Sequence, residues 1–343
     1  MPRLLTPPDL LTLRHKPRAL VLLHPDAGLL AAPRPFVYGL RALLSNHGHD
    51  SSLYQRDGAV SAVLHATAPS NRPVRELLAF ASYGPALRYP SDHDIWYRLL
   101  EAHVIASANQ QVQRVYATLN AGDDLDEIFR QSGYGCYAKQ TLFRLDGPDW
   151  NQGTRVAAMQ PQTRADVWGV HQLYGAVTPK PVQHAEARTA RDWALPLPTP
   201  WDAVKHRAWV LHEAERVVAT VRIKSSRTAH VITVMADPDF RADFADMLRH
   251  GISQIADTLP IWLSLREYQD ELRWPAQDLG FHPYCEQHAL VRHMTAFARS
   301  TNFARVLEPR RERGTPVPSI TPIAAPPPPT QARHHGTTER HHE

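Results

Sequence analysis

The chain has 343 residues, of which 43% are hydrophobic and 21% charged, so its composition is that of an ordinary globular protein with room for two domains. The formal net charge of +4 is small for this length and no dense Lys/Arg run lies inside the predicted domains, so we expect no nucleic-acid partner. There is no run of about 18 apolar residues and no apolar N-terminal stretch of signal-peptide length, which predicts a cytoplasmic protein without a membrane partner. The two cysteines, Cys136 and Cys285, form no CxxC pattern and the histidines are scattered, so we expect no metal site.

The first half of the chain, residues 18–147, alternates strand and helix patterns. Residues 1–17 are rich in proline and predict a loosely held N-terminal arm. Asp57-Gly58 lies between two apolar alternations and predicts a β-hairpin, Asp94 is a candidate helix N-cap, and Gly133 occupies a helix-ending position. The predicted elements are strand 18–24, helix 36–44, strands 51–56 and 58–67, strand 74–82, helix 95–113, strand 114–119, helix 125–131 and strand 136–145.

The second half, residues 154–300, repeats this plan. Its predicted elements are strand 154–159, helix 165–177, an irregular stretch 179–200, hairpin strands 206–213 and 216–224, strand 229–235, helix 240–256, strand 259–265, a short helix ended at Gly280, and strand 286–293. Strands that alternate with helices predict an α/β fold whose mixed sheet is partly parallel and covered by helices. The repetition predicts two tandem domains. Residues 309–343 are rich in Pro, Thr and His and predict a disordered tail.

The order of elements in each half, with a Gly-aromatic pair after the last helix, resembles the GNAT family of acetyl-CoA-dependent N-acetyltransferases. The resemblance is carried by residues 115–120 and 124–134 in the first half and by residues 259–265 and 271–281 in the second. The family's Asn…Tyr…Gly-Phe segment is matched by Asn120, Phe129 and Gly133-Tyr134, and in the second half only by Gly280-Phe281. The resemblance implies two tandem GNAT-like acyl-CoA N-acyltransferase domains.

The resemblance also implies a mechanism. Acetyl-CoA would be the co-substrate, with its pantetheine arm between the splayed strands 74–82 and 114–119 and its diphosphate at a helix N-terminus. The acceptor would be an amine of a small molecule or peptide. A general base would take the amine proton, and an acid would protonate the departing thiolate.

Five residues are candidates for these roles. Asn120 could contact the pantetheine or the substrate, and Arg88 and His93 could offer positive charge at the phosphate end of the first half. Arg241 could meet a phosphate in the second half, and Glu76 could be the catalytic base. Three of them have a structural alternative: Asn120 as a turn former, Glu76 on a solvated face, and Arg241 as a surface residue of a first helical turn.

The sequence departs from the family where the chemistry is most demanding. Neither phosphate loop has the family's glycines, and the second loop places Asp243 and Asp246 where a diphosphate would lie. The family's thiolate-protonating tyrosine is matched by Phe129 and Ala276, which cannot donate a proton. The alternative function is therefore a catalytically inactive GNAT-fold binding or scaffolding protein. The first half is the better candidate for activity. If side chains fill the opening between the splayed strands in both halves, the protein is not expected to be an enzyme.

Overall fold

The computed structural model describes residues 1–26, 28–30, 33–45, 50–69, 72–85, 92–147, 158–197 and 203–294, and every structural statement below concerns these residues. Residues 1–297 form one compact unit. Its strands join in one mixed sheet in the order β1-β3-β4-β5-β6-β13-β7-β12-β11-β10-β9-β8, and β2 pairs with β5 beside this path. The predicted mixed α/β sheet is confirmed. No helix in the described ranges is long and apolar enough to cross a membrane.

The first half contains the predicted elements with small shifts at their ends. Helix α3 begins at Asp92, two residues before the expected N-cap Asp94, and α4 has the predicted bounds. Gly133 has a φ of +75°, a backbone conformation that glycine adopts easily but that would be strained in a residue with a side chain. The elements are β1 (Arg3–Leu4), α1 (Leu10–Leu13), β2 (Ala19–Leu22), α2 (Pro35–Leu44), β3 (Asp50–Asp57), β4 (Val60–Thr67), β5 (Val74–Tyr83), α3 (Asp92–Asn109), β6 (Arg114–Asn120), α4 (Leu125–Gln131) and β7 (Gly135–Leu145).

The second half follows the predicted plan with three differences. Residues 154–157 of the predicted strand 154–159 lie outside the described residues, and the strand found there is Met159–Pro161. The stretch expected to be irregular contains a helix and a 3-10 turn. Helix α7 begins only at Phe244, because residues 238–243 before it form a 3-10 helix that starts at Pro238 and is capped by Asp237. The elements are β8 (Met159–Pro161), α5 (Asp166–Val177), α6 (Lys180–Glu186), η3 (Ala190–Trp193), β9 (Lys205–Glu213), β10 (Arg216–Ser225), β11 (His230–Ala236), η4 (Pro238–Asp243), α7 (Phe244–Ser253), β12 (Ile261–Arg266), η5 (Glu267–Leu272), α8 (Arg273–Asp278) and β13 (His282–His293).

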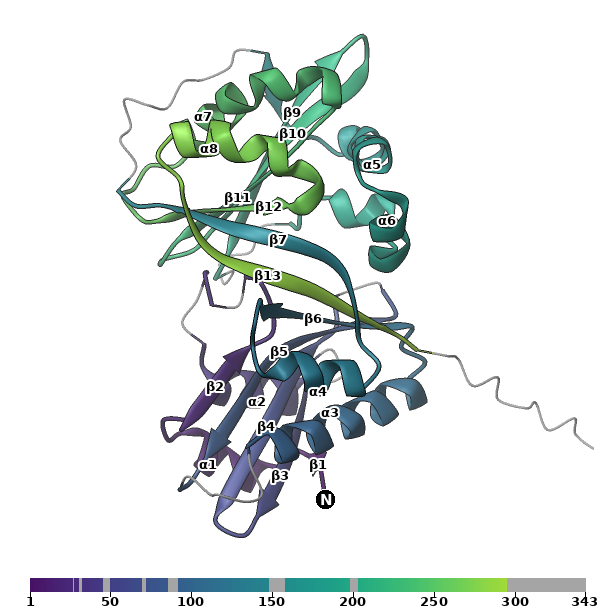
Figure 1. Cartoon of the computed structure of the whole chain (residues 1–343), viewed down its shortest axis with the longest axis vertical. Helices are drawn as coiled ribbons and strands as arrows, with labels where there is room; N and C mark the ends of the chain where they lie inside the picture. The colour runs from purple at the N-terminus through teal and green to yellow at the C-terminus, as the bar shows by residue number, and fades with distance from the viewer. Residues whose placement is uncertain are drawn as a thin grey trace, which may run out of the picture. The chain divides into compact units, whose positions relative to one another are not determined.

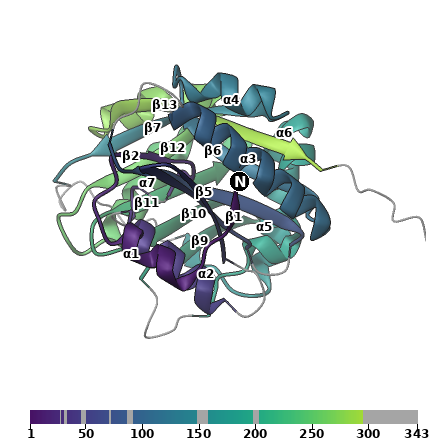
Figure 2. The ribbon, with the colours of Figure 1, turned by 90° about the horizontal axis from the view of Figure 1, so that it is seen from below.

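Helices cover both faces of the sheet in each half, because successive strand residues point to opposite faces. In the first half Leu64 and Phe80 pack against α3 and α4, while Val63 and Ala81 pack against α1 and α2; Figure 2 shows α1 and α3 as separate layers. In the second half α7 and α8 cover one face, and α5 and η3 cover the other.

The two halves exchange their last strands. β13, from the end of the second half, lies between β6 and β7, and β7, from the end of the first half, pairs with β12. Figure 1 shows β7 and β13 side by side. As a result Leu290 is buried in the first-half core, and Phe143 and Leu145 are buried in the second-half core. The predicted division between residues 147 and 154 therefore does not separate two independently packed bodies.

The N-terminal segment is not a loosely held arm, and that expectation is wrong. Arg3–Leu4 pairs with β3, and the Arg3 guanidinium binds the Asp9 carboxylate at 2.6 Å. Leu5 and Leu13 are buried against the sheet. Their apolar side chains fix the segment even though it is rich in proline. The predicted tail, residues 309–343, lies outside the described residues.

Candidate active site

Both halves have a pair of parallel strands that separates after three residues. β5 pairs with β6 only from Val74 to Glu76, and β11 pairs with β12 only from His230 to Ile232. Beyond these pairs the strands splay, which exposes backbone groups of both strands at the opening. Whatever satisfies those groups decides what each opening can bind.

Strand β2 fills the opening of the first half. It runs antiparallel to the splayed part of β5, with Ala19 opposite Ser82 and Leu22 opposite Ala79. Leu23 then bridges the two strands: its N–H donates to Leu78 of β5 at 2.9 Å, and its carbonyl accepts from the N–H of Thr118 of β6 at 2.8 Å. The backbone groups that an extended ligand would pair with are taken. The first half is thus not the better candidate for donor binding, contrary to the sequence-based expectation.

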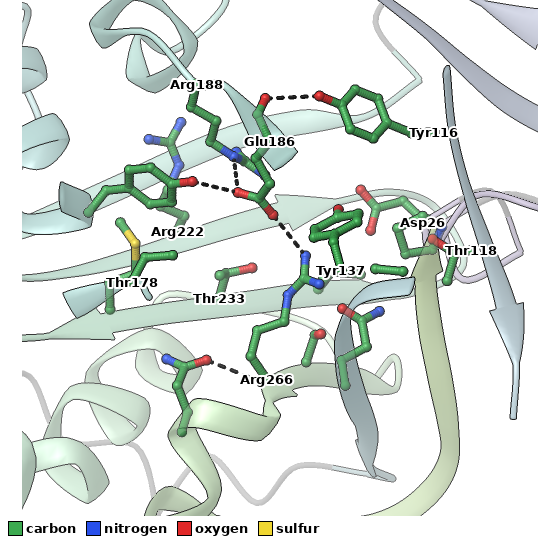
Figure 3. A pocket seen from close by; sticks show the side chains of 18 of the residues that line it. Asp26, Tyr116, Thr118, Tyr137, Thr178, Glu186, Arg188, Arg222, Thr233 and Arg266 are labelled. Carbon is green, nitrogen blue, oxygen red and sulfur yellow. Dashed lines mark hydrogen bonds and ion pairs between the residues drawn. The ribbon is translucent and has the colours of Figure 1, made fainter. Parts of the chain in front are cut away.

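The opening of the second half leads into a cavity of about 370 Å³ (Figure 3). Thr233, Val234 and Met235 of β11 line it together with Ser264 and Arg266 of β12. The opposite wall comes from the first half and includes His24, Glu76, Tyr116, Thr118 and Tyr137. The cavity therefore needs both halves, and the exchange of β7 and β13 holds the two walls together.

Glu186 is the centre of one charged cluster in the cavity. Its carboxylate accepts from the Tyr174 hydroxyl at 2.9 Å, from Arg188 Nε at 2.8 Å and from Arg266 Nη2 at 3.2 Å (Figure 3). Burial by itself would raise the pKa of Glu186, but the two arginines and Tyr174 outweigh it and the pKa is lowered. Glu186 stays ionised and fully engaged, so it orders the cavity wall and is a poor general base.

A second cluster comes mainly from the first half. His24 Nε2 contacts the Glu76 carboxylate at 3.1 Å, and the Asp26 N–H donates to His24 Nδ1 at 3.2 Å, which places the proton of neutral His24 on Nε2. Burial opposes charge on both partners, yet their attraction outweighs it: the pKa of His24 is raised and that of Glu76 is lowered. Asp26 is ion-paired with Lys224. Of the three carboxylates in the wall, Glu76 is paired with a histidine, whereas Asp26 is paired with a lysine and Glu186 with two arginines.

The charge of the cavity wall is positive. Five permanently cationic side chains line it, against three carboxylates; the cations are Arg72, Arg188, Arg222, Lys224 and Arg266, and the carboxylates are Asp26, Glu76 and Glu186. An excess of positive charge in the wall of a cavity favours an anionic ligand.

The structure brings one of the predicted site residues into the cavity wall. Glu76 lines it, whereas Asn120 lies at the exposed end of β6, where its Oδ1 accepts from Gln287 Nε2 at 3.3 Å, outside the cavity lining. His93 is exposed on the first turn of α3, with its ring 5.8 Å from that of Trp96. Arg88 lies outside the described residues. Sequence reasoning thus grouped residues that the fold keeps apart.

The phosphate end of the second half carries mainly negative charge. Arg241, the predicted phosphate ligand, is ion-paired with Glu271, and Arg216 is paired with Asp237 at 3.0 Å. Asp243 and Asp246 lie at the start of α7 with Asp239 close before them. Acidic side chains stabilise a helix N-terminus but repel a phosphate there. This loop would therefore contribute little binding free energy to the diphosphate of the donor.

Sequence reasoning missed the polar face of β10. Thr220, Arg222 and Lys224 alternate with apolar residues and all three line the cavity. The alternation was visible in the sequence, but it is the pattern of any hairpin with one solvated face. Only the position of β10 opposite the first half turns this face inward.

Comparisons with known proteins support the fold. No protein-family model matches the chain, and no curated protein matches it. The structure of a GCN5-related N-acetyltransferase from Sphaerobacter thermophilus is similar over 86% of this chain and 95% of its own, with 12% identity and a TM-score of 0.52. A tandem GNAT protein from the clavulanic acid biosynthesis pathway is similar over 84% and 93%, with 14% identity and a TM-score of 0.45. The fold is therefore that of the GNAT acetyltransferases.

Proposed function

We propose that this protein is a GNAT-type N-acyltransferase in which only the second half takes the acyl donor. The pantetheine arm of an acyl-CoA enters between β11 and β12, and an amine acceptor binds in the shared cavity. The observation that carries this proposal is the contrast between the openings: β2 fills the first, while the second leads into a cavity lined by ionised groups.

The backbone of β11 offers a group for the oxyanion. The Val234 carbonyl points into the opening, because it accepts from Gln269 Nε2 at 3.2 Å. In an antiparallel pair the N–H and C=O of one residue point to the same edge, so the Val234 N–H also points into the opening. An N–H at this place would stabilise negative charge on the thioester oxygen as the amine attacks.

Two side chains in the wall can move protons. Glu76 is ionised and would accept the proton of the attacking amine, with His24 holding its carboxylate in place. Tyr268 lies in the wall two residues after the end of β12, and its phenol would protonate the departing thiolate. In the second half the resemblance matched this role only to Ala276, which is fully buried in the core, and Tyr268 would take its place.

The test is release of free thiol from acetyl-CoA in the presence of a panel of primary amines, with the acetylated product identified by mass spectrometry. Replacing Glu76 by Gln should lower kcat by about 100-fold or more, because general-base catalysis contributes at least that much. The control is Glu127→Gln on the exposed face of α4, whose carboxylate accepts from Arg130 and Gln131 of the same helix. Unchanged turnover in the Glu76 variant would contradict the assigned role.

A second candidate function rests on the acidic loop. Asp243 and Asp246 lie where the resemblance would put a donor diphosphate, which suits a GNAT-fold protein that binds a ligand in the cavity without transferring an acyl group. Ligand binding without thiol release from any acyl thioester would support this candidate.

A further inference from the structure

One cation in the cavity is not neutralised by the protein. Arg222 Nη1 donates to the Trp193 carbonyl at 2.9 Å and lies 3.5 Å from Gln162 Oε1. Both partners are neutral, and within the described ranges no carboxylate is paired with this guanidinium. The other cations differ: Lys224 is paired with Asp26, and Arg188 and Arg266 share Glu186.

Two further polar groups in the same cavity have no partner. Thr220, two residues before Arg222 on the same face of β10, is 1% exposed, and its hydroxyl makes no hydrogen bond to the described residues. Arg266 Nη1 is also without a partner there, although Nη2 of the same group binds Glu186. Buried polar groups are almost always hydrogen-bonded, so these two unsatisfied groups, beside a guanidinium without a counter-ion, indicate a missing partner that accepts hydrogen bonds.

Keeping Arg222 charged carries a free-energy cost. Burial and the nearby Arg188 lower the pKa of Arg222 to about 10. The side chain is held against the Trp193 ring, with its guanidinium carbon 5.6 Å from the ring centroid, so it cannot easily turn to solvent. A partly buried cation that lacks a protein counter-ion is expected where a ligand supplies the negative charge.

The two walls of the cavity offer opposite charges to a ligand. β10 of the second half presents Arg222, while β5 of the first half presents Glu76. A molecule with an amine and an anionic group could therefore face a carboxylate with one end and a guanidinium with the other. An amine without an anionic group would leave Arg222 and Thr220 unsatisfied.

We propose that the ligand of the shared cavity is an amine that also carries a carboxylate or a phosphate group, and that Arg222, Arg266 and Thr220 bind this anionic group. This inference rests on the proposed function in one respect: the amine is the group that would be acylated. The binding itself requires no acyl donor.

The experiment is isothermal titration of the full chain without any thioester. The probes are the common amino acids beside their carboxamides, and O-phosphoethanolamine beside ethanolamine. We expect at least one anionic member to bind and its neutral counterpart to bind at least tenfold more weakly. A carboxylate ligand would show in the first pairs and a phosphate ligand in the second. Equal binding within the pairs, or no binding by any probe, would overturn the proposal.

Two variants locate the site. Arg222→Met should weaken binding at least tenfold and should raise the thermal stability of the free protein, because a buried unpaired charge is removed. Thr220→Val, which keeps the side-chain shape, should weaken binding several-fold and provides the test if the first variant fails to fold. The control is Arg249→Met, a surface residue paired with Asp246. Unchanged affinity in both cavity variants would overturn the assignment.

Failure of this inference and failure of the proposed function give different results. Selective binding of an anionic amine without acyl transfer leaves the inference standing and removes the acyltransferase. Transfer to neutral amines at a rate unaffected by Arg222→Met removes the inference and leaves the acyltransferase standing.

Discussion

Replacing Leu290 by Ala tests the exchange of last strands. Leu290 belongs to β13, at the end of the second half, but it is buried at 6% exposure in the core of the first half. Its strand pairs with β6 on one side and with β7 on the other. A loss of packing at Leu290 should therefore destabilise the core of the first half. The strand register places Leu290 opposite Ala117, more than 150 residues earlier in the sequence.

The expected size follows from the burial. Truncation of a buried leucine removes transfer free energy and leaves a cavity, which together cost about 2–5 kcal/mol. Leu290 is 6% exposed and lies close to the end of the described residues, so some collapse around the gap is expected. We predict a loss of about 3 kcal/mol in the free energy of unfolding.

Denaturant unfolding followed by circular dichroism measures the total loss, and hydrogen exchange with mass spectrometry locates it. Faster exchange should appear in peptides from α3 and α4, which pack in the same core as Leu290. The matched control is Leu248→Ala in α7, a fully buried leucine of the second-half core. Its effect should appear first in α7 and α8.

Two results would refute this reasoning. One is a loss of less than about 1 kcal/mol in the Leu290 variant, which would mean that β13 does not complete the first-half core. The other is faster exchange confined to second-half peptides, which would place β13 with its own half.

Three further predictions concern the donor, the first opening and acid stability. Because the loop with Asp243 is acidic, acetyl-pantetheine should serve as donor with a KM within about tenfold of that for acetyl-CoA; a much larger gap would show that the diphosphate is bound after all. Leu23→Ala should cost about 2–4 kcal/mol in unfolding free energy, measured by denaturant titration, yet leave donor binding unchanged, because Leu23 helps fill an opening that the donor does not use. Burial lowers the pKa of both His65 and His103 to about 3. As the pH falls below about 6.5, these two histidines therefore bind protons in the unfolded chain but stay neutral in the folded chain. Stability should fall as the pH falls from about 6.5 toward 3, by up to about 1.4 kcal/mol per pH unit for each histidine. His103→Gln should reduce this slope in denaturant titrations at pH 6, 5 and 4, and an unchanged slope would contradict the assignment.

Local signals in the sequence predicted most of the fold. Alternating apolar residues defined β9 and β10, and the helical spacing around Leu125 and Ile128 gave α4 its observed bounds. The exchange of β7 and β13 could not be predicted in this way, because both strands have the pattern of a central strand and either neighbour would satisfy it. The role of β2 was hidden for the same reason: its run Ala19–Leu22 predicts a buried strand and says nothing of which strand it joins.

The site was less predictable than the fold. Glu76 reaches the cavity because β5 ends its pairing with β6 at that residue, and the strand pattern gave no sign of this. Arg222 and Glu186 belong to the second half but act beside residues of the first, and their meeting depends on tertiary structure alone. The acidic character of the second phosphate loop was visible in the sequence, and the structure adds that Arg241 is already occupied by Glu271.

The most direct test of the account is the titration of acetyl-CoA into two matched variants. Ser264 and Thr118 line the cavity just beyond the paired parts of β12 and β6, Ser264 one residue and Thr118 two residues after the last pair, so each lies at the mouth of one opening. Ser264→Trp should abolish donor binding, whereas Thr118→Trp should retain it, with circular dichroism confirming that both variants fold. Binding retained by the Ser264 variant and lost in the Thr118 variant would place the donor in the first half and contradict the account.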